Sequence, residues 1–298
     1  MSDILYIKKK CVDEYFNYSI SFEERAERIS NLLSTLERPL KQKTLFDIFI
    51  KPLKFISSEN VRKHLIEHYA LAMHFFTEND FDYVCAVMGM EGIGKSTFAL
   101  NLGMLLSSIG DRRNFGMDDI IFAKDNHEKV VEKILNKTNS VIMFDEARPF
   151  FDLRSSMSPE RLEKLEIITT ERWRRNIYIL CISDISELDK YFRERRIRTL
   201  FVIPDRKIFF ALQNKSFFGM GQDRFFLDKL EFQLNTSSFV DYQRNLNLLK
   251  QLPSCFGYGY FDKIDADSKL WNEYMELKKQ SKDKFLKKKE LTLLSYEK

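Results

Sequence analysis

The stretch Gly89-Met90-Glu91-Gly92-Ile93-Gly94-Lys95-Ser96 constrains the fold of this chain more than any other part of it. It matches the phosphate-binding loop pattern G-x-x-x-x-G-K-[ST], which needs a strand before it and a helix after it. The mostly apolar run 81–88 predicts a buried strand, and residues 97–106 predict a helix. The sequence therefore supplies the strand–loop–helix context that the motif requires.

The chemistry of this loop follows from its residue types. Glycines let the backbone turn tightly and bring its N–H groups to phosphate oxygens, and the next helix adds its positive end. We expect Lys95 to reach the β- and γ-phosphates of ATP and Ser96 to ligate Mg²⁺. The predicted nucleotide contacts are Gly89, Glu91, Gly92, Ile93, Gly94, Lys95, Ser96 and Thr97. The alternative is a glycine-rich turn with an exposed lysine.

The whole chain suits a globular protein with a substantial core. It has 298 residues, of which 44% are hydrophobic, enough for one large domain or a core domain with appendages. Its net charge of +4 favours anionic partners without requiring one. None of the four cysteines lies in a C-x-x-C pair, so the sequence has no zinc or redox signature of that kind. We see no apolar run long enough for a membrane-spanning helix.

Residues 1–80 are predicted to be mostly helical. Apolar residues recur at helical spacing in 22–33, and Ser58 is placed to cap a helix over 59–76. That helix contains His64-Leu65-Ile66-Glu67-His68, which matches the inverted zinc-protease pattern H-x-x-E-H. The two histidines share a helix face, so zinc ligation is one interpretation. Ordinary histidines on a helix surface are the interpretation we favour, because no further ligand is identifiable.

A second motif follows the loop by about fifty residues. After a short strand at 120–123 and a helix at 126–135 capped by Asp125, the apolar run 141–144 ends in Asp145-Glu146. This is the pattern of a Walker B strand, whose acids emerge beside the phosphate loop. We expect Asp145 to hold Mg²⁺ through a water molecule and Glu146 to polarise the water that attacks the γ-phosphate. The alternative is an acid pair that caps a loop.

The rest of the core alternates helices and strands. We predict a helix at 158–175, a strand at 177–182, a helix at 185–196 and a strand at 199–203. With the earlier strands these make five, and the alternation predicts right-handed crossovers and an α/β fold with a mainly parallel five-stranded sheet. The division is 1–80 as a helical segment, 81–204 as the nucleotide-binding core and 205–298 as an extension.

The extension changes character after Pro204. Residues 207–212 and 225–232 are predicted as strands of a hairpin, with Gly219 and Gly221 between them, and 252–260 as irregular. Basic residues interleaved with aromatics would suit single-stranded nucleic acid, but a half-buried hairpin explains them as well. A final helix from about Ser268 enters the lysine-rich stretch 278–290, which either contacts nucleic acid phosphates or is a solvated end.

These motifs, in this order, resemble the P-loop NTPases of the additional-strand, catalytic-glutamate class. Over residues 80–205 the chain looks most like the FtsK–HerA group of DNA-pumping ATPases, whose relatives include viral packaging ATPases and zonula-occludens-toxin-like proteins. The resemblance implies a 5-1-4-3-2 sheet, DNA as a partner, and a homo-oligomer such as a hexameric ring. The location we expect is the cytoplasm, or the host cytoplasm for a viral protein, because cysteines without a pairing pattern fit a reducing compartment.

The resemblance further implies that a neighbouring subunit contacts the γ-phosphate through an arginine. By position the finger candidates are Arg172, Arg174 and Arg175, just before the fourth strand; surface salt bridging is the alternative. Further candidates are Arg148, Arg193, Arg195, Arg196 and Arg198. Ser183 and Asp184 occupy the place where the family often has a sensing glutamine, so phosphate sensing there is in question.

Three functions are compatible with these residues. The first is an ATP-hydrolysing, ring-forming motor acting on DNA. The second is a nucleotide-gated switch or adaptor that binds DNA or a protein without translocation. The third, a small-molecule kinase, is weaker because Asp145-Glu146 suits activation of water and no acceptor pocket can be identified in the sequence.

Overall fold

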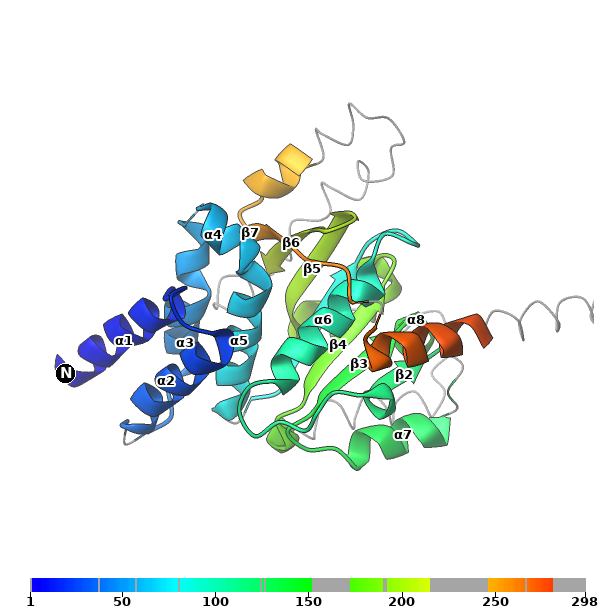
Figure 1. Cartoon of the computed structure of the whole chain (residues 1–298), viewed down its shortest axis with the longest axis horizontal. Coiled ribbons are helices and arrows are strands. Elements are labelled where there is room, and N and C mark those ends of the chain that lie inside the picture. The colour runs from blue at the N-terminus through cyan, green and yellow to red at the C-terminus, as the bar shows by residue number, and fades with distance from the viewer. Residues whose placement is uncertain are drawn as a thin grey trace, which may run out of the picture.

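The computed structural model describes residues 2–36, 38–56, 58–79, 81–123, 125, 127–151, 172–189, 192–214, 246–265 and 267–280. At its centre is a seven-stranded mixed sheet in the order β2-β3-β4-β1-β5-β6-β7 (Figure 1). The strands are β1 (Tyr83–Met88), β2 (Ile120–Phe122), β3 (Val141–Asp145), β4 (Ile177–Ile182), β5 (Ile197–Asp205), β6 (Ile208–Gln213) and β7 (Cys255–Tyr260).

The prediction of a mainly parallel five-stranded sheet is wrong for the sheet as a whole. The five strands β2-β3-β4-β1-β5 are parallel and lie in the expected order. However, β6 adds to β5 in antiparallel fashion through a two-residue turn in which Lys207 has φ +72°, and β7 then pairs with β6. An edge strand presents unpaired N–H and C=O groups, and the extension uses them instead of forming a separate hairpin.

Strand β7 lies in the stretch predicted to be irregular. Aromatic residues and glycines alternate along it, with Phe256, Tyr258 and Tyr260 separated by Gly257 and Gly259. Glycines weaken a strand pattern, but they also mark places where another backbone approaches closely. A Cβ atom on Gly259 would lie 2.5 Å from the carbonyl oxygen of Arg62 and 2.8 Å from Cβ of Leu65. The glycines are therefore what allows β7 to pack beside the N-terminal helices.

Both faces of the sheet are buried. On β1, Tyr83, Cys85 and Val87 join one hydrophobic cluster, while the alternate residues join another. The first cluster continues through α6 (Lys95–Ser107) into the N-terminal helices, and the second includes α8 (Arg148–Phe151). Burial on both faces explains why the strands are continuous apolar runs.

The predicted helical character of the N-terminal segment is confirmed. Its helices are α1 (Ser2–Tyr15), α2 (Phe22–Ser34), α3 (Gln42–Phe49), a 3₁₀ turn (Lys51–Lys54), α4 (Glu59–Lys63) and α5 (Leu65–Glu78). Ser58 caps α4 as predicted, accepting a hydrogen bond from the amide of Val61, but the helix is interrupted at His64. Helix α5 is buried around most of its surface because it lies between α3 and α6 and also packs on β1.

The single helix predicted at 185–196 is instead two short turns. These are a 3₁₀ turn (Ile185–Glu187) and a π-helical turn (Phe192–Arg196), and helix α7 (His127–Leu135) follows β2 as expected. Most of the helix predicted at 158–175, the strand at 225–232 with Gly219 and Gly221, and the lysines beyond residue 280 lie outside the described residues.

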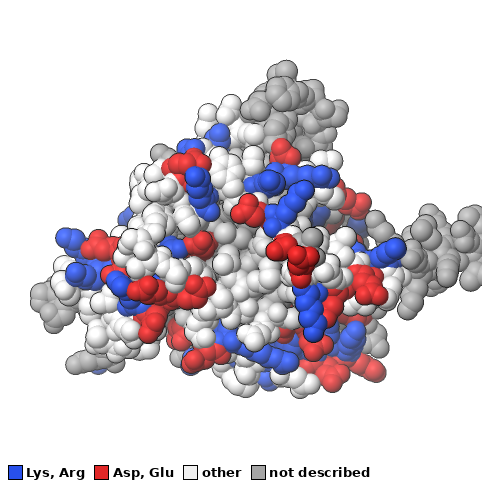
Figure 2. Space-filling view, viewed as in Figure 1, with Lys and Arg blue, Asp and Glu red and all other residues white. Residues whose placement is uncertain are grey.

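The extension returns to the sheet after β7. The chain runs from β7 past α6 and enters a helix over 269–280, which lies near β2, β3 and α8 (Figure 1). None of the helices in the described ranges is both long and apolar enough to cross a membrane. On the face drawn in Figure 2, acidic and basic side chains are interspersed and neither sign dominates.

Candidate active site

The phosphate loop joins the C-terminal end of β1 to α6 and depends on its glycines. Gly92 and Gly94 have φ of +75° and +110°, a region that residues with a Cβ atom rarely adopt. A Cβ atom on Gly89 would lie 2.6 Å from the carbonyl oxygen of Ile203 on β5. Each of the three positions therefore requires glycine, two for their backbone angles and one for its close contact with β5. The loop ends at the N-terminus of α6, where unpaired helical amides favour an anion.

Lys95, the first residue of α6, folds back over the loop. Its Nζ atom donates hydrogen bonds to the carbonyl oxygens of Gly89 at 2.6 Å and Met90 at 2.8 Å. Burial of the ammonium group lowers the pKa of Lys95 from its usual value. Binding of phosphate would give this ammonium anionic oxygens in place of neutral carbonyls, which is the stronger kind of partner.

Ser96 and Asp145 connect the two predicted motifs. The hydroxyl of Ser96 donates a 2.8 Å hydrogen bond to Oδ1 of Asp145, which is the last residue of β3 and is buried. A hydroxyl and a carboxylate are the hard oxygen ligands that Mg²⁺ prefers. The ammonium of Lys278 lies 3.3 Å from the hydroxyl oxygen of Ser96 and 3.3 Å from Oδ2 of Asp145. The donor set therefore fits Mg²⁺, with Ser96 and Asp145 as the residues that would hold it.

Glu146 follows β3 directly and is exposed to solvent. Its φ of +64° is unusual for a residue with a side chain, and such conformations are concentrated at functional sites. The turn is fixed by the next residue, because the amide of Ala147 donates a 2.8 Å hydrogen bond to the carbonyl oxygen of Cys181 on β4. The carboxylate of Glu146 therefore belongs to the cavity at the ends of β1, β3 and β4.

That cavity has a volume of about 1070 Å³, large enough for a nucleotide. It brings together most of the residues predicted for the site: Glu91, Gly92, Gly94, Lys95, Ser96, Thr97, Asp145 and Glu146. Of the other predicted contacts, Ile93 packs its Cγ2 atom close to Gly89, so these two residues shape the loop.

One side of the cavity is formed by a helix that was predicted from the sequence but was not assigned to the site. Trp271, Tyr274 and Lys278 on helix 269–280 line it. The hydroxyl of Tyr274 donates a 2.9 Å hydrogen bond to Oδ2 of Asp145, and Lys278 donates a 2.7 Å hydrogen bond to that hydroxyl. Spacings of three and four place these side chains on one helix face. That amphipathic face is the signal that could have directed attention to the helix, although not to its partner.

The three predicted arginine fingers lie near the N-terminal ends of β4 and β1, at the opposite end of the strands from the phosphate loop. Arg172–Arg174 form a 3₁₀ turn just before β4, whose first residue Ile177 pairs with Tyr83 at the start of β1. Because the strands are parallel, roughly 17 Å of strand separates them from the phosphate loop. Arg174 donates a 2.6 Å hydrogen bond to the carbonyl oxygen of Leu135 at the end of α7 and stacks over Trp173. Arg175 has φ +56°.

The further arginine candidates differ in their positions. Arg148 lines the cavity next to the Walker B acids. Arg196 is buried in an ion pair with Asp82, and Arg198 lies over the rings of Phe76, Phe81 and Tyr83, so both have structural roles. Arg193 and Arg195 belong to the π-helical turn.

Of the two residues at the predicted sensing position, Ser183 lines the cavity and Asp184 caps the next turn. Ser183 lines the cavity at the end of β4, and its amide donates a 3.3 Å hydrogen bond to Glu187. Asp184 directs its carboxylate to the amide of Ser186 at 2.7 Å, where it caps the following turn.

The histidines of the H-x-x-E-H pattern have other partners. Nδ1 of His64 is 2.9 Å from Oε1 of Glu67, and Nε2 of His68 is 2.6 Å from the hydroxyl of Tyr18. His68 is completely buried, so the expectation of two surface histidines is wrong for this residue. Burial lowers its pKa well below the usual value. Within the described ranges, no three His, Cys, Asp or Glu side chains are grouped to hold a metal.

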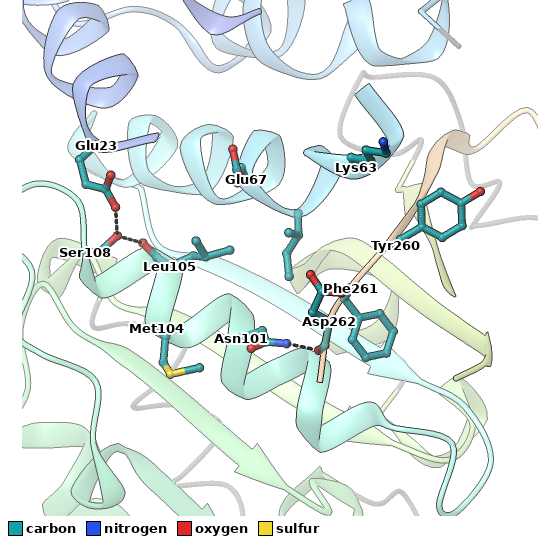
Figure 3. A pocket seen from close by; sticks show the side chains of 11 residues that line it. Glu23, Lys63, Glu67, Asn101, Met104, Leu105, Ser108, Tyr260, Phe261 and Asp262 are labelled. Atoms are coloured by element: carbon teal, nitrogen blue, oxygen red, sulfur yellow. Dashed lines mark hydrogen bonds between the residues drawn. The ribbon is translucent and has the colours of Figure 1, made fainter. Parts of the chain in front are cut away.

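A second cavity, of about 430 Å³, lies behind α6 (Figure 3). Helices α2, α5 and α6 and the segment after β7 surround it. Ser108 donates a 3.3 Å hydrogen bond to Glu23 across one end, and Asn101 donates a 2.8 Å hydrogen bond to the carbonyl oxygen of Asp262 at the other. The N-terminal helices and the extension therefore both contact the helix that carries the phosphate loop.

Comparison with known proteins gives similarity in structure only. No protein-family model and no curated protein matches the sequence. The genome packaging NTPase of Sulfolobus turreted icosahedral virus 2, in complex with ATPγS, is 13% identical with a TM-score of 0.31, over 44% of this chain and 92% of that chain. The N-terminal domain of zonular occludens toxin from Neisseria meningitidis is 16% identical with a TM-score of 0.32, over 55% and 98%.

A chain of the HORMA:CdnC:Trip13 complex of E. coli MS115-1 is 13% identical with a TM-score of 0.32, and the match covers 79% of this chain and 76% of that one. The viral NTPase and the toxin are the two kinds of relative that the sequence resemblance names. Similarities at these TM-scores carry no argument about function, which has to rest on the residues of the site.

Proposed function

We propose that this chain is a Mg²⁺-dependent ATPase whose active site is the cavity at the C-terminal ends of β1, β3 and β4. The observation that carries the proposal is the 2.8 Å hydrogen bond between Ser96 and Asp145. Two motifs that are about fifty residues apart in the sequence meet there, side chain to side chain. Their meeting provides one position where a metal would contact both the loop that binds phosphates and the strand that precedes the catalytic acid.

Each residue has a role that follows from its chemistry. Lys95 and the loop amides bind the phosphates of ATP, and Glu146 accepts a proton from the attacking water as a general base. Mg²⁺, held by Ser96 and Asp145, supplies positive charge that stabilises the developing charge on the phosphates. The next residue, Ala147, fixes the backbone of Glu146 by its hydrogen bond to Cys181.

We further propose that the ATPase works as a ring-forming motor on DNA. The positions of Arg172, Arg174 and Arg175 support this, because they lie at the opposite end of the strands from the phosphate loop of their own chain and are too far to reach it. The turn 172–174 that bears two of these arginines is joined to the end of α7 by the hydrogen bond from Arg174 to Leu135, and β4 begins shortly after it. The net charge of +4 agrees with an anionic partner.

A nucleotide-gated switch is the second candidate function. It is favoured by a specific observation, the position of helix 269–280 against Ser96 and Asp145. An element that contacts the nucleotide site directly can take a different position when nucleotide binds and can present that change to a partner. Such a switch would hydrolyse ATP slowly and would show no stimulation by DNA.

Two substitutions test the ATPase. Lys95→Ala is expected to abolish ATP binding, since it removes the cation of the loop. Glu146→Gln is expected to bind ATP normally and to hydrolyse it at least about 100-fold more slowly, because an amide cannot act as a general base. Binding is measured by calorimetry and turnover by phosphate release. Lys269→Ala and Glu128→Gln, both at exposed helix positions, are the matched controls.

The results separate the steps of the proposal. Normal turnover in Glu146→Gln would remove Glu146 from its assigned role. Normal ATP binding in Lys95→Ala would show that the loop is not the phosphate site. Loss of both functions in the control variants would point to unfolding.

A further inference from the structure

We propose that helix 269–280 inhibits the enzyme by placing the ammonium of Lys278 where Mg²⁺ is needed, an inference that rests on the ATPase proposed above. The helix would have to leave Ser96 and Asp145 before metal and nucleotide bind together. Binding of Mg²⁺ with ATP and docking of this helix are then competing states of one site.

The contacts of Lys278 carry the inference. Its Nζ atom lies 3.3 Å from the hydroxyl of Ser96, 3.3 Å from Oδ2 of Asp145 and 2.7 Å from the hydroxyl of Tyr274. Ser96 and Asp145 are the two residues whose oxygens would hold the metal. The ammonium places a single positive charge against the same serine hydroxyl and carboxylate that Mg²⁺ would contact with its double charge.

Tyr274 completes this arrangement. Its hydroxyl donates a hydrogen bond to Oδ2 of Asp145 at 2.9 Å, while Ser96 already donates to Oδ1. The carboxylate therefore has both oxygens occupied by donors from this chain.

Lys278 and Mg²⁺ exclude each other for physical reasons. Mg²⁺ binds through oxygen lone pairs, and at Ser96 and Asp145 it would need lone pairs that Lys278 and Tyr274 now use. Two cations that share the same oxygens would also lie within a few ångströms and repel each other. The same ammonium cannot therefore stay in place when the metal arrives.

The helix is held by one face only, which makes release feasible. Tyr274 is buried and stacks against Phe122 and Trp271, whereas Asn272, Glu273 and Glu276 are exposed. Lys278 itself retains 37% of its side-chain exposure, so water reaches its ammonium. Ahead of the helix in the sequence, Asn101 on α6 donates a hydrogen bond to the carbonyl oxygen of Asp262. Phe261 lies beside the loop at Gly94, so this part of the chain also contacts the nucleotide site.

The test measures Mg²⁺-dependent binding of ATPγS by calorimetry in the full chain. Lys278→Met keeps the aliphatic stem and removes the ammonium. We expect it to lower the Mg²⁺ concentration for half-maximal binding about three- to tenfold, as for loss of a half-exposed charged contact. Tyr274→Phe, which removes one hydroxyl, is expected to act in the same direction. Lys269→Met, at a position on the same helix with 90% exposure, is the matched control and should leave binding unchanged.

A second readout follows the helix itself. The chain has two tryptophans, so Trp173→Phe leaves Trp271 as the only one. We expect the emission of Trp271 to shift to longer wavelength when Mg²⁺ and ATPγS are added together, because release of the helix moves this partly buried ring away from the cavity and into water. Mg²⁺ alone, or ATPγS with a chelator, should give a smaller shift.

Each result decides between the alternatives. Weaker binding of ATPγS in Lys278→Met would overturn the inhibition and assign Lys278 to nucleotide binding instead. Unchanged Mg²⁺ dependence in both variants, or an unshifted Trp271 while ATPγS is bound, would also overturn it. If the wild-type chain binds no ATPγS at saturating Mg²⁺, the proposed ATPase itself fails, which is a distinguishable outcome.

Discussion

Asp145 is the residue at which the two Walker motifs and helix 269–280 meet. It accepts hydrogen bonds from Ser96, Tyr274 and Lys278, and it stands directly before Glu146. A buried carboxylate is stabilised by such donors, because they replace the hydrogen bonds that water would otherwise make to its oxygens. The hydrogen bonds from Tyr274 and Lys278 must break when a metal binds. Both the proposed hydrolysis of ATP and its proposed inhibition therefore depend on the side chain of Asp145.

The backbone of Glu146 gives a prediction at the residue scale. A left-handed conformation costs a residue with a Cβ atom about 1–2 kcal/mol, which exceeds the entropy of about 0.5–1 kcal/mol that glycine adds to the unfolded chain. Glu146→Gly should therefore raise the free energy of unfolding by about 0.5–1 kcal/mol while it abolishes hydrolysis. Glu146→Gln, which keeps the Cβ atom, should leave stability unchanged. Denaturant unfolding of both variants checks this, and equal stability of the two would contradict it.

His74 gives a prediction about pH. Burial, with a smaller effect of Arg112, lowers the pKa of His74 to about 3, whereas an unfolded chain protonates histidine near its usual value. The unfolded state therefore binds more protons between these values. Stability is complete above about pH 6.5 and falls as the pH drops towards 3, by up to about 1.4 kcal/mol per pH unit for this residue.

The variant His74→Phe removes this titration and keeps a ring of similar size. We expect its free energy of unfolding to depend less steeply on pH between 4 and 6 than that of the wild type. Some dependence should remain because the pKa of the buried His68 is also lowered. Parallel pH profiles for the two proteins would show that His74 does not contribute.

The residues of the two Walker motifs could be predicted because each motif is a local pattern with a fixed place at the end of a strand. Tyr274 and Lys278 could not be predicted as site residues. They contact Asp145 across 129 and 133 positions, and nothing local to residues 269–280 specifies that partner. The lysines there suggested a solvated end, because the sequence of a helix face gives its composition but does not identify the element that packs against it.

At the scale of elements, the parallel part of the fold was the predictable part. Strands buried on both faces are continuous apolar runs, which β1, β3 and β4 are. Strand β7 was missed because its glycines resemble a turn, although they serve close packing against α4 and α5. The antiparallel addition of β6 and β7 depends on how the extension meets the edge of β5, which no local periodicity determines.

The packing of β7 leads to a prediction for this element. A Cβ atom on Gly259 would contact the backbone of Arg62 at 2.5 Å, so Gly259→Ala should lower the free energy of unfolding by about 1–3 kcal/mol. At Gly116 the backbone is extended and the nearest atom to a new Cβ is 4.0 Å away. Gly116→Ala should leave stability unchanged or raise it by up to about 1 kcal/mol. Thermal unfolding of both variants compares them, and equal effects would contradict the close approach.

At the scale of the whole molecule, the arginines before β4 lie at the N-terminal ends of the strands, and the phosphate loop lies at their C-terminal ends. If a site is shared between subunits, a mixture of two inactive variants should recover activity. A subunit with Glu146→Gln still has its arginines, and a subunit with Arg174→Ala still has its phosphate loop and Glu146. Where the two meet in the right order, the interface contains every residue that the shared site needs. Mixing Glu146→Gln with Lys95→Ala is the control, since both defects are on the same side and no complete interface forms. Equal ATPase rates in the two mixtures would contradict a shared site.

The most direct test of the proposed motor is the ATPase rate per protomer, measured against protein concentration with and without single- and double-stranded DNA. We predict that the rate rises with concentration as subunits assemble and rises further when one form of DNA is added. A rate per protomer that stays the same at every concentration and with either form of DNA would contradict the account.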